Sequence, residues 1–340
     1  SAIEPAGVAV QNCQMGGITQ ARVQMTADGT VEVHSDRTEI GQGSEASHAI
    51  IVSDILGCKR EDVFVKPVTS DFIGQGPLSS RGAVYPASAV AKAAKILRKK
   101  VCQCAAVFLK CREDSLVLEK GNIFSSDEPE KKLTFKELAN KAFYFPGPRG
   151  LPPEILKNHD HLLDVTTTWY SPTTPDSGSS YTSFCTSADV VIVEVDIDTG
   201  TTRIVKYAHV HDAGTIIDRQ IVDGQIHGGI VQGIGEALYE HLDYDDKGRL
   251  LTSTFSTYLI PTAVEAPDIE IAHLETPSPF TETGSKGMGE APIIGSKAVV
   301  LAAIEDALTP FGIEVNESPA TPERVRKWVL DARKQQEEAK

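Results

Sequence analysis

The sequence predicts an α+β fold in which mixed β-sheets are covered by long helices. Each half of the chain contains a hairpin of alternating apolar and polar residues that turns at a glycine, at Asp28-Gly29 and at Thr199-Gly200. A helical segment follows each hairpin, and no strict strand–helix–strand rhythm connects them. We therefore predict two α/β subdomains, residues 1–165 and 166–340.

The first half is expected to contain a hairpin over residues 21–40 and then a helix that Ser44 or Ser47 could cap. A short strand is expected in VFVKPVTSD, and a Gly- and Pro-punctuated loop then opens into a long alanine-rich helix. Residues 113–165 read as polar and irregular, with one short helix near 134–142.

The second half is expected to begin with a longer hairpin over residues 187–214. The segment GQIHGGIVQGIGEALYE predicts a helix whose regularly spaced glycines permit close approach of another backbone. The tail predicts an amphipathic helix, with Thr321 as its N-cap and Pro322 at its first position.

Composition excludes several classes of function. The formal net charge of −14 over 340 residues argues against a nucleic-acid or anionic-membrane partner, because either would require a basic surface. The sequence contains no run of 18 apolar residues and no basic-then-apolar leader, so we expect a cytoplasmic protein.

Cofactor and metal signatures carried by short motifs are missing. No G-x-G-x-x-G follows a strand, there is no P-loop, and Glu45 beside the GQG at 41–43 would repel a pyrophosphate. H-E-x-x-H and C-x-x-C are also absent, and the C-x-C-x6-C spacing is not a zinc spacing. We expect no protein-ligated metal and interpret the cysteines as packed thiols: Cys13, Cys58, Cys102, Cys104, Cys111 and Cys185.

Three glycine-rich segments carry amide or hydroxyl donors: TEIGQG, GPLSSRG and GGIVQGIG. Each taken alone indicates a glycine turn or a tight helix contact. Glycines beside Gln42 and Gln232 would bring backbone N–H groups near a ligand, and the two side-chain amides add donors and acceptors. Together with Glu290, which ends the glycine-rich loop TGSKGMGE, they indicate a cradle for a large polar cofactor with a base beside it.

The order of these motifs resembles the molybdenum hydroxylases, the family of xanthine dehydrogenase and aldehyde oxidoreductase. The matching segments run from about residue 17 to ATPERV and are, in order, EIGQG, SSRG, DAG, GQIHGGIVQGIG, FSTYLIP and GSKGMGEAP. The resemblance implies the second molybdenum-binding region of the xanthine dehydrogenase-like fold. The family's GGxFG and AFRG elements are not found, and a split of this kind resembles the medium molybdopterin subunit of nicotinate dehydrogenase. A large molybdopterin subunit would then supply the other half of the site.

The resemblance also implies a cofactor and a mechanism. Molybdenum would be held by a pterin dithiolene, in bacteria usually as molybdopterin cytosine dinucleotide, with FeS clusters and FAD on partner subunits. A carboxylate takes a proton from a hydroxide on molybdenum, which attacks an electron-poor carbon, and hydride passes to a sulfido or selenido ligand. Glu290 aligns with this base. We expect the glycines to bring it near the metal and the apolar helix to exclude water, because a dry base has a raised pKa.

Other roles carry over residue by residue. The segments with a cofactor-binding role are the GQG loop, the SSRG loop, the VQG of the glycine-rich helix and the residues before the base; their residues are Gln42, Gly43, Ser79, Ser80, Arg81, Gln232, Gly233, Ser285, Lys286 and Gly287. Lys286 could equally be a solvated surface charge. His211 and Asp212 are interpreted as a strand end, with Asp212 capping a turn.

One departure from the family concerns the substrate. Purine-oxidising members hold a flat ring with a phenylalanine 31 residues before the GQG glutamine, and that position here is Gln11. Either the gapless count fails, a partner chain supplies the clamp, or polar contacts bind the substrate. Gln11 and Asn12 would suit a carboxylated N-heteroaromatic such as nicotinate. The alternatives are a purine or an aldehyde substrate on the same cofactor, or a non-catalytic scaffold subunit.

Overall fold

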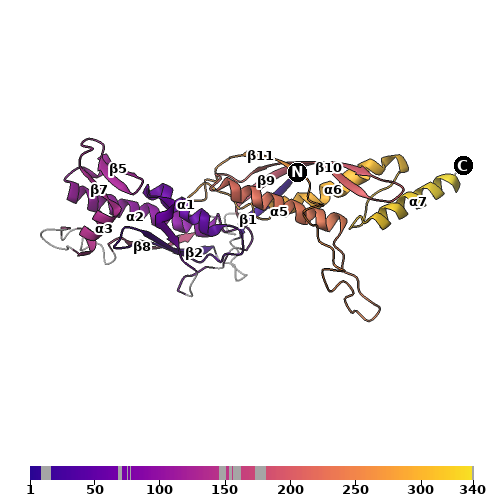
Figure 1. Ribbon diagram of the computed structural model, residues 1–340, viewed down its shortest axis with the longest axis horizontal. Coiled ribbons are helices and arrows are strands. Elements are labelled where there is room, and N and C mark those ends of the chain that lie inside the picture. Colours follow the sequence, from indigo (N-terminus) through magenta and orange to yellow (C-terminus); the bar gives the residue numbers. More distant parts are fainter. Residues whose placement is uncertain are drawn as a thin grey trace.

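The computed structural model describes residues 1–8, 17–67, 71–74, 76, 78–144, 151–152, 155, 162–172 and 181–338. Three β-sheets with covering helices form within these ranges. The molecule is elongated, with the first half of the chain at one end and the second half at the other (Figure 1). The α+β fold with mixed sheets and long helices is thereby confirmed.

The first sheet has the order β4-β3-β2-β8. The predicted hairpin forms its centre and turns at Gly29, whose φ of 88° suits glycine. Two helices lie against this sheet. The bounds of these elements are β2 (Ile18–Met25), β3 (Val31–Ser35), β4 (Val63–Val65), β8 (Asp164–Tyr170), α1 (Ser44–Leu56) and α2 (Tyr85–Leu109).

Alternating residues of the hairpin make the core of this half. Ala21, Val23 and Met25 are fully buried on one face of β2, which packs against the alanine-rich α2. Alanine allows a helix to lie close to a sheet because its side chain is small. Cys102 and Cys104 are buried in the same core, and burial raises the pKa of the Cys104 thiol to about 12. The interpretation of these cysteines as packed thiols is confirmed.

A small third sheet, β5-β6-β7, follows α2. It consists of β5 (Leu116–Glu119), β6 (Asn122–Ser125) and β7 (Lys132–Thr134), and α3 (Phe135–Tyr144) closes it. The short helix was predicted correctly. The expectation of irregular structure before it was wrong, because these strands are too short and polar to show a clear alternation.

The second sheet has the order β1-β9-β10-β11. Its centre is the predicted second hairpin, which turns at Gly200 with a φ of 79°. The strands are β1 (Ala2–Val8), β9 (Tyr181–Val195), β10 (Thr202–Asp212) and β11 (Ile269–Leu274). Two strands depart from the proposed division at residue 165. Strand β8 runs across residue 165, and β1, from the first half of the chain, pairs with β9 in the second half.

Helix α6 (Ala291–Leu308) lies against β9 and β1 of this sheet, and α5 (Arg219–Leu238) packs tightly on α6. A Cβ added at Gly233 would lie 1.7 Å from Oγ of Ser296, and one at Gly229 would lie 2.9 Å from Cβ of Pro292. The predicted close approach at the glycine-spaced helix is confirmed. The tail helix α7 (Pro322–Glu338) also begins as predicted, with the Arg324 N–H donating to Thr321 Oγ1 at 3.4 Å.

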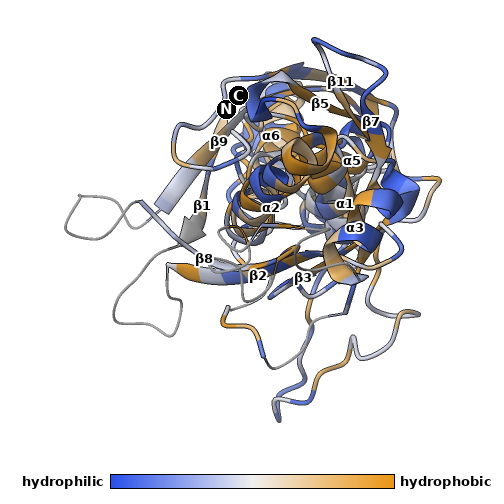
Figure 2. Ribbon diagram, turned by 90° about the vertical axis from the view of Figure 1, so that its left-hand side faces the viewer, coloured by the Kyte–Doolittle hydropathy of each residue, from blue (hydrophilic) through white to orange (hydrophobic). Residues whose placement is uncertain are grey.

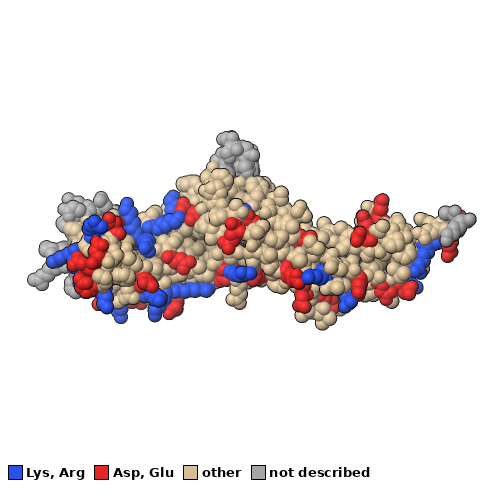
Figure 3. Space-filling view, turned by 90° about the horizontal axis from the view of Figure 1, so that it is seen from above, with Lys and Arg blue, Asp and Glu red and all other residues tan. Residues whose placement is uncertain are grey.

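The view along the long axis superimposes the two ends of the molecule, with α1 and α3 nearer its edge (Figure 2). Helices α2, α5 and α6 lie in the middle, with β2, β3 and β8 on one side and β9 and β11 on the other. On the face shown in Figure 3, Lys and Arg side chains are interspersed with Asp and Glu side chains. None of the helices in the described ranges combines the length and apolar character that a membrane crossing requires.

Candidate active site

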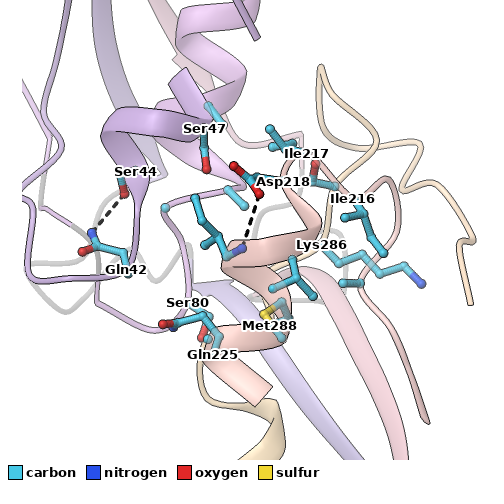
Figure 4. A pocket seen from close by; sticks show the side chains of 18 of the residues that line it. Gln42, Ser44, Ser47, Ser80, Ile216, Ile217, Asp218, Gln225, Lys286 and Met288 are labelled. Carbon is cyan, nitrogen blue, oxygen red and sulfur yellow. Dashed lines mark hydrogen bonds between the residues drawn. The ribbon is translucent and has the colours of Figure 1, made fainter. Parts of the chain in front are cut away.

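A cavity of about 280 Å³ lies where the two halves meet (Figure 4). Its walls come from the N-terminal end of α1, the loop before α2, the first two turns of α5 and the loop before α6. Five of the predicted site residues line it, although their motifs lie far apart in the sequence: Gln42, Ser80, Ser285, Lys286 and Glu290.

Glu290 lies at the N-cap of α6, at the rim of this cavity. The helix begins at Ala291, directly after Glu290, and the Glu290 side chain makes no capping hydrogen bond to it. Its backbone N–H donates to Ser80 Oγ at 3.0 Å. The side chain is exposed in this chain, so the expectation that the apolar helix alone keeps the base dry was wrong.

The loop that carries Glu290 is held in place on both sides. Gly284 has a φ of 78°, and the Lys286 N–H donates to the carbonyl of Ala213 at 2.8 Å. A Cβ at Gly287 would lie 2.2 Å from the carbonyl oxygen of Ser80. These glycines therefore allow close packing of backbone on backbone, and the loop is tied down by its neighbours.

Lys286 is not a solvated surface charge. Its Nζ lies 3.1 Å from Oδ2 of Asp212, and only 14% of the lysine side chain is exposed. Burial alone would raise the pKa of Asp212, but the side chain and backbone of Thr276, the Gly214 N–H and Lys286 lower it to about 2. Asp212 ends β10 and caps the following turn, as predicted.

The SSRG loop is conformationally strained. Ser79 and Ser80 have φ values of 54° and 48°, a region that costs non-glycine residues about 1–3 kcal/mol. Of the three predicted residues in this loop, Ser80 alone lines the cavity. Arg81 is buried beneath the loop, with its guanidinium 4.1 Å from the centre of the Tyr85 ring and one N–H donating to the carbonyl of Ile18. Arg81 therefore supports the loop rather than facing the cavity.

The amide of Gln42 organises its own loop. Its Nε2 donates to the Thr38 carbonyl at 2.9 Å and to Ser44 Oγ at 3.0 Å, and its Oε1 accepts from the Ile40 N–H at 2.7 Å. Figure 4 shows the Gln42–Ser44 hydrogen bond at the cavity wall. Gln42 therefore shapes the wall, with most of its hydrogen-bonding capacity already used.

The backbone donors at the start of α1 are also occupied. Glu39 accepts hydrogen bonds from the N–H groups of Gly41, Gly43 and Glu45. The N-cap is Gly43, so the expectation that Ser44 or Ser47 caps the helix was wrong. A Cβ at Gly43 would lie 2.5 Å from the Ile221 side chain, so a residue larger than glycine would collide with α5 at this position.

The predicted residues of α5 lie away from the cavity. Gln232 is exposed and Gly233 packs on α6, whereas Gln225, two turns earlier, lines the cavity (Figure 4). An N-cap residue in the sequence could have indicated this. Asp218 caps α5 by accepting hydrogen bonds from the Gln220 and Ile221 N–H groups, and the helix therefore begins beside the cavity, with its first turns in the wall.

His48 was also missed. It lies on α1, lines the cavity and is 1% exposed, and its Nδ1 makes no hydrogen bond within the described residues. Burial, with a smaller contribution from Arg37, lowers its pKa to about 3, so the ring is neutral at physiological pH. Its helical spacing from Ser44 is the signal that places both on the face toward the cavity.

The remaining predictions concern substrate and metal. Gln11 and Asn12 lie outside the described residues. Across the described ranges, no group of three His, Cys, Asp or Glu side chains is placed to hold a metal ion.

The fold and the cavity together define a candidate site whose walls carry hydroxyl and amide side chains and the carboxylates of Asp218 and Glu290. A family model described as the molybdopterin cofactor-binding domain matches residues 2–267. The chain belongs to this family and is a molybdenum hydroxylase family member, in the second molybdenum-binding region of that fold.

Individual relatives agree with the family. The chain is 36% identical over 332 residues to the nicotine 6-hydroxylase large subunit of Paenarthrobacter nicotinovorans, covering 95% of this chain and 39% of the relative. It is 33% identical to the xanthine dehydrogenase molybdenum-binding subunit of Escherichia coli O157:H7, covering 91% and 39%. Quinoline 2-oxidoreductase of Pseudomonas putida 86 superposes with a TM-score of 0.84 at 35% identity, covering 97% and 41%. The chain thus spans about two fifths of the relatives' length.

The residues present fit one side of such a cofactor. The cavity carries the Ser44, Ser47 and Ser80 hydroxyls and the Gln225 amide, a donor and acceptor set suited to a polar heterocycle. Its volume of about 280 Å³ is at the lower end for small-molecule sites, which span about 300–1,000 Å³. A molybdopterin cofactor therefore needs further walls beyond those that the described residues provide.

Proposed function

We propose that this chain forms the base-bearing wall of a molybdenum site, with Glu290 as the general base, in an enzyme that hydroxylates an N-heteroaromatic compound. The oxygen would come from water and enter at an electron-poor carbon. The observation that carries the proposal is the position of Glu290, at the rim of a cavity whose largely apolar wall carries a few serine and glutamine side chains, and fixed there through its backbone by Ser80.

The chemistry of this chain's own residues follows from that position. The Glu290 carboxylate, which stands directly before α6, accepts the proton released as oxygen is transferred. Ser80 fixes the backbone of the base through its N–H, the close packing at Gly287 fixes the loop before it, and Gln225 orients a polar group in the cavity. The molybdenum cofactor, for which we propose the cytosine dinucleotide form, supplies the two-electron redox chemistry when bound.

The relatives favour an N-heteroaromatic substrate. By their names, two of them act on nicotine and on quinoline, both of which contain a ring nitrogen. A nicotinate-like compound is our specific proposal, with Gln11 and Asn12 as candidate hydrogen-bonding groups. A purine is the alternative, since another relative is named as a xanthine dehydrogenase subunit.

Exposed apolar side chains support a larger assembly. Val190 and Ile192 are 66% and 52% exposed on β9, and Phe255 and Val264 are 81% and 88% exposed in the segment before β11. Surfaces of this kind are typically covered by further protein. We propose that the rest of the molybdenum region covers them and closes the site, and that FeS clusters and FAD lie on partner subunits.

The base assignment is tested by Glu290→Gln in the assembled enzyme. Turnover should fall by roughly 10²- to 10⁴-fold, the usual contribution of a general base, while molybdenum and cytidine nucleotide contents stay normal. The matched control is Glu236→Gln, which changes a half-exposed carboxylate of α5 that is paired with Lys297. Turnover that survives in Glu290→Gln sinks the assignment.

The substrate and cofactor proposals are tested on the same preparation. Molybdenum, selenium and cytidine nucleotide are measured in the purified complex, and a metal-free complex would favour the scaffold alternative. Nicotinate, nicotine, quinoline, xanthine, hypoxanthine and a simple aldehyde are then compared by kcat/KM. The proposal predicts the highest value for one of the three N-heteroaromatic compounds that are not purines.

A further inference from the structure

A buried histidine in the cavity wall has hydrogen-bonding capacity that the chain itself does not use. His48 lies on α1 and lines the cavity, although only 1% of the residue is exposed. Its Nδ1 is enclosed and makes no hydrogen bond within the described residues, and none of them forms a hydrogen bond with Nε2. A buried polar group without a partner is costly, so this ring calls for an explanation.

The ring of His48 presents its Nε2 edge to the cavity. Nδ1 is sealed from solvent, so the opposite edge is the one that reaches the cavity surface. Burial lowers the pKa of the ring to about 3, so the ring is neutral and has one N–H and one acceptor nitrogen. Buried N–H groups without an acceptor are rarer than buried acceptors without a donor. The proton therefore belongs on Nε2, where a bound group can accept it.

The cavity wall that contains this donor is largely apolar. Ala83 and Ala87, beside and within the start of α2, line the cavity together with Ile221 of α5. Ligand sites of this kind combine apolar walls with a few polar groups that fix the orientation of the ligand. Apolar side chains can cover the faces of a flat ring while His48 donates to an atom at its edge.

The charged groups of this region disfavour an anion as the partner of His48. The N–H groups at the start of α1, where a phosphate would ordinarily bind, already donate to Glu39. Lys286 lines the cavity, but its ammonium group is paired with Asp212 at 3.1 Å. An uncharged acceptor therefore fits the His48 N–H better than a phosphate does.

We propose that His48 binds the ring system of the molybdopterin cofactor by donating its Nε2–H to an uncharged ring nitrogen or carbonyl oxygen. The family model that covers α1 is that of a molybdopterin-binding domain, and a pterin ring has acceptors of both kinds. The hydrogen bond satisfies a donor that the protein leaves unpaired and fixes the ring against α1. This assignment depends on the family's cofactor and neither on the substrate nor on Glu290 as the base.

Cofactor retention tests this assignment without turnover. Assembled complexes are dialysed at a fixed temperature, and the pterin that remains is released, oxidised and measured by its fluorescence. His48→Phe keeps a ring of similar size without a donor, whereas His48→Gln keeps an amide N–H near the position of Nε2. We expect His48→Phe to lose pterin roughly tenfold faster than wild type, and His48→Gln to stay within about threefold, because one buried hydrogen bond separates them.

The matched control is His34→Phe, which changes a partly buried histidine of β3 outside the cavity and should retain pterin as wild type does. If His48 only packs against its neighbours, the order reverses, because phenylalanine fills the space of the ring better than glutamine. That reversed order, or equal rates in both variants, refutes the hydrogen bond.

The comparison also decides when one variant does not assemble. His48→Phe with wild-type retention, or His48→Gln with tenfold faster loss, refutes the assignment on its own, and so does a wild-type complex that contains no pterin. A wild-type complex that retains pterin but turns over no N-heteroaromatic compound refutes the proposed function and leaves the retention test in force.

Discussion

The ammonium group of Lys286 and the carboxylate of Asp212 form an ion pair, 3.1 Å apart, that joins the base loop to the end of β10. The pair is only slightly exposed, so water screens it less than a surface pair. Asp212 also accepts hydrogen bonds from the Gly214 and Thr276 N–H groups, and one carboxylate therefore anchors three segments of chain.

Replacing this anchor should destabilise the protein. The folded-state pKa of Asp212, about 2, lies below the ordinary value of 3.8, so its stabilisation is present above about pH 4 and is lost as the pH falls through 2. We expect Asp212→Asn to lower the free energy of unfolding at pH 7 by about 2 kcal/mol. Urea titrations at pH 7 measure the change, with the exposed Asp246→Asn as the control. Equal effects of both substitutions would refute the anchoring role.

The glycines of the base loop should not tolerate a side chain. Gly287→Ala would place Cβ 2.2 Å from the Ser80 carbonyl, so either the base loop or the SSRG loop must move. We expect a loss of about 1–3 kcal/mol in the free energy of unfolding, the range for overpacking, and a large loss of turnover.

The matched control for this substitution is Gly228→Ala. Gly228 lies in α5 with no atom within 4 Å of an added Cβ. Alanine is favoured over glycine within a helix by up to about 1 kcal/mol, so this variant should be as stable as wild type or more stable. Thermal unfolding of both variants gives the comparison, and a Gly287→Ala variant with wild-type stability contradicts the close packing.

The contact between α5 and α6 can be tested by a compensating pair. Gly233→Ala places Cβ 1.7 Å from Oγ of Ser296, whose hydroxyl otherwise donates to the Ile293 carbonyl. The single substitution should destabilise by about 1–3 kcal/mol, and adding Ser296→Gly should recover part of that loss. A double-mutant cycle measures the recovery; strict additivity of the two effects would mean that these residues do not touch in solution.

Local signals predicted the elements of this fold well where periodicity and turn chemistry agreed. Both hairpins turn at the predicted glycines, and α7 begins at the predicted proline after Thr321. The pairing of strands from different parts of the chain was beyond local signals: β1 pairs with β9, with Ala2 opposite Ser187, and no short window of sequence contains both strands.

The candidate site shows the same limit. The glycine-rich motifs indicated which segments would meet, and the cavity brings Gln42, Ser80 and Glu290 together. The motifs did not indicate which side chain of each segment points inward. On α5, Gln225 in the second turn reaches the cavity, whereas Gln232, two turns later, does not.

Acid should weaken this fold through a buried histidine. His211 is 1% exposed, and burial, with further contributions from His209 and His273, lowers its pKa to about 4. The unfolded chain binds a proton there below about pH 6.5 and the folded chain does not, so stability falls as the pH drops from 6.5 toward 4.

We expect this residue to contribute about 2 kcal/mol to the loss of unfolding free energy between pH 7 and pH 5. His211→Phe keeps a ring between His209 and His273, whose ring centres lie 5.5 and 4.8 Å away, and should remove that part of the pH dependence. Urea titrations at both pH values measure it, with the exposed His227→Phe of α5 as the control. A residual slope is expected from the buried His48, whose pKa is also lowered. An unchanged slope in His211→Phe would show that the ring takes up a proton in the folded protein as readily as in the unfolded chain.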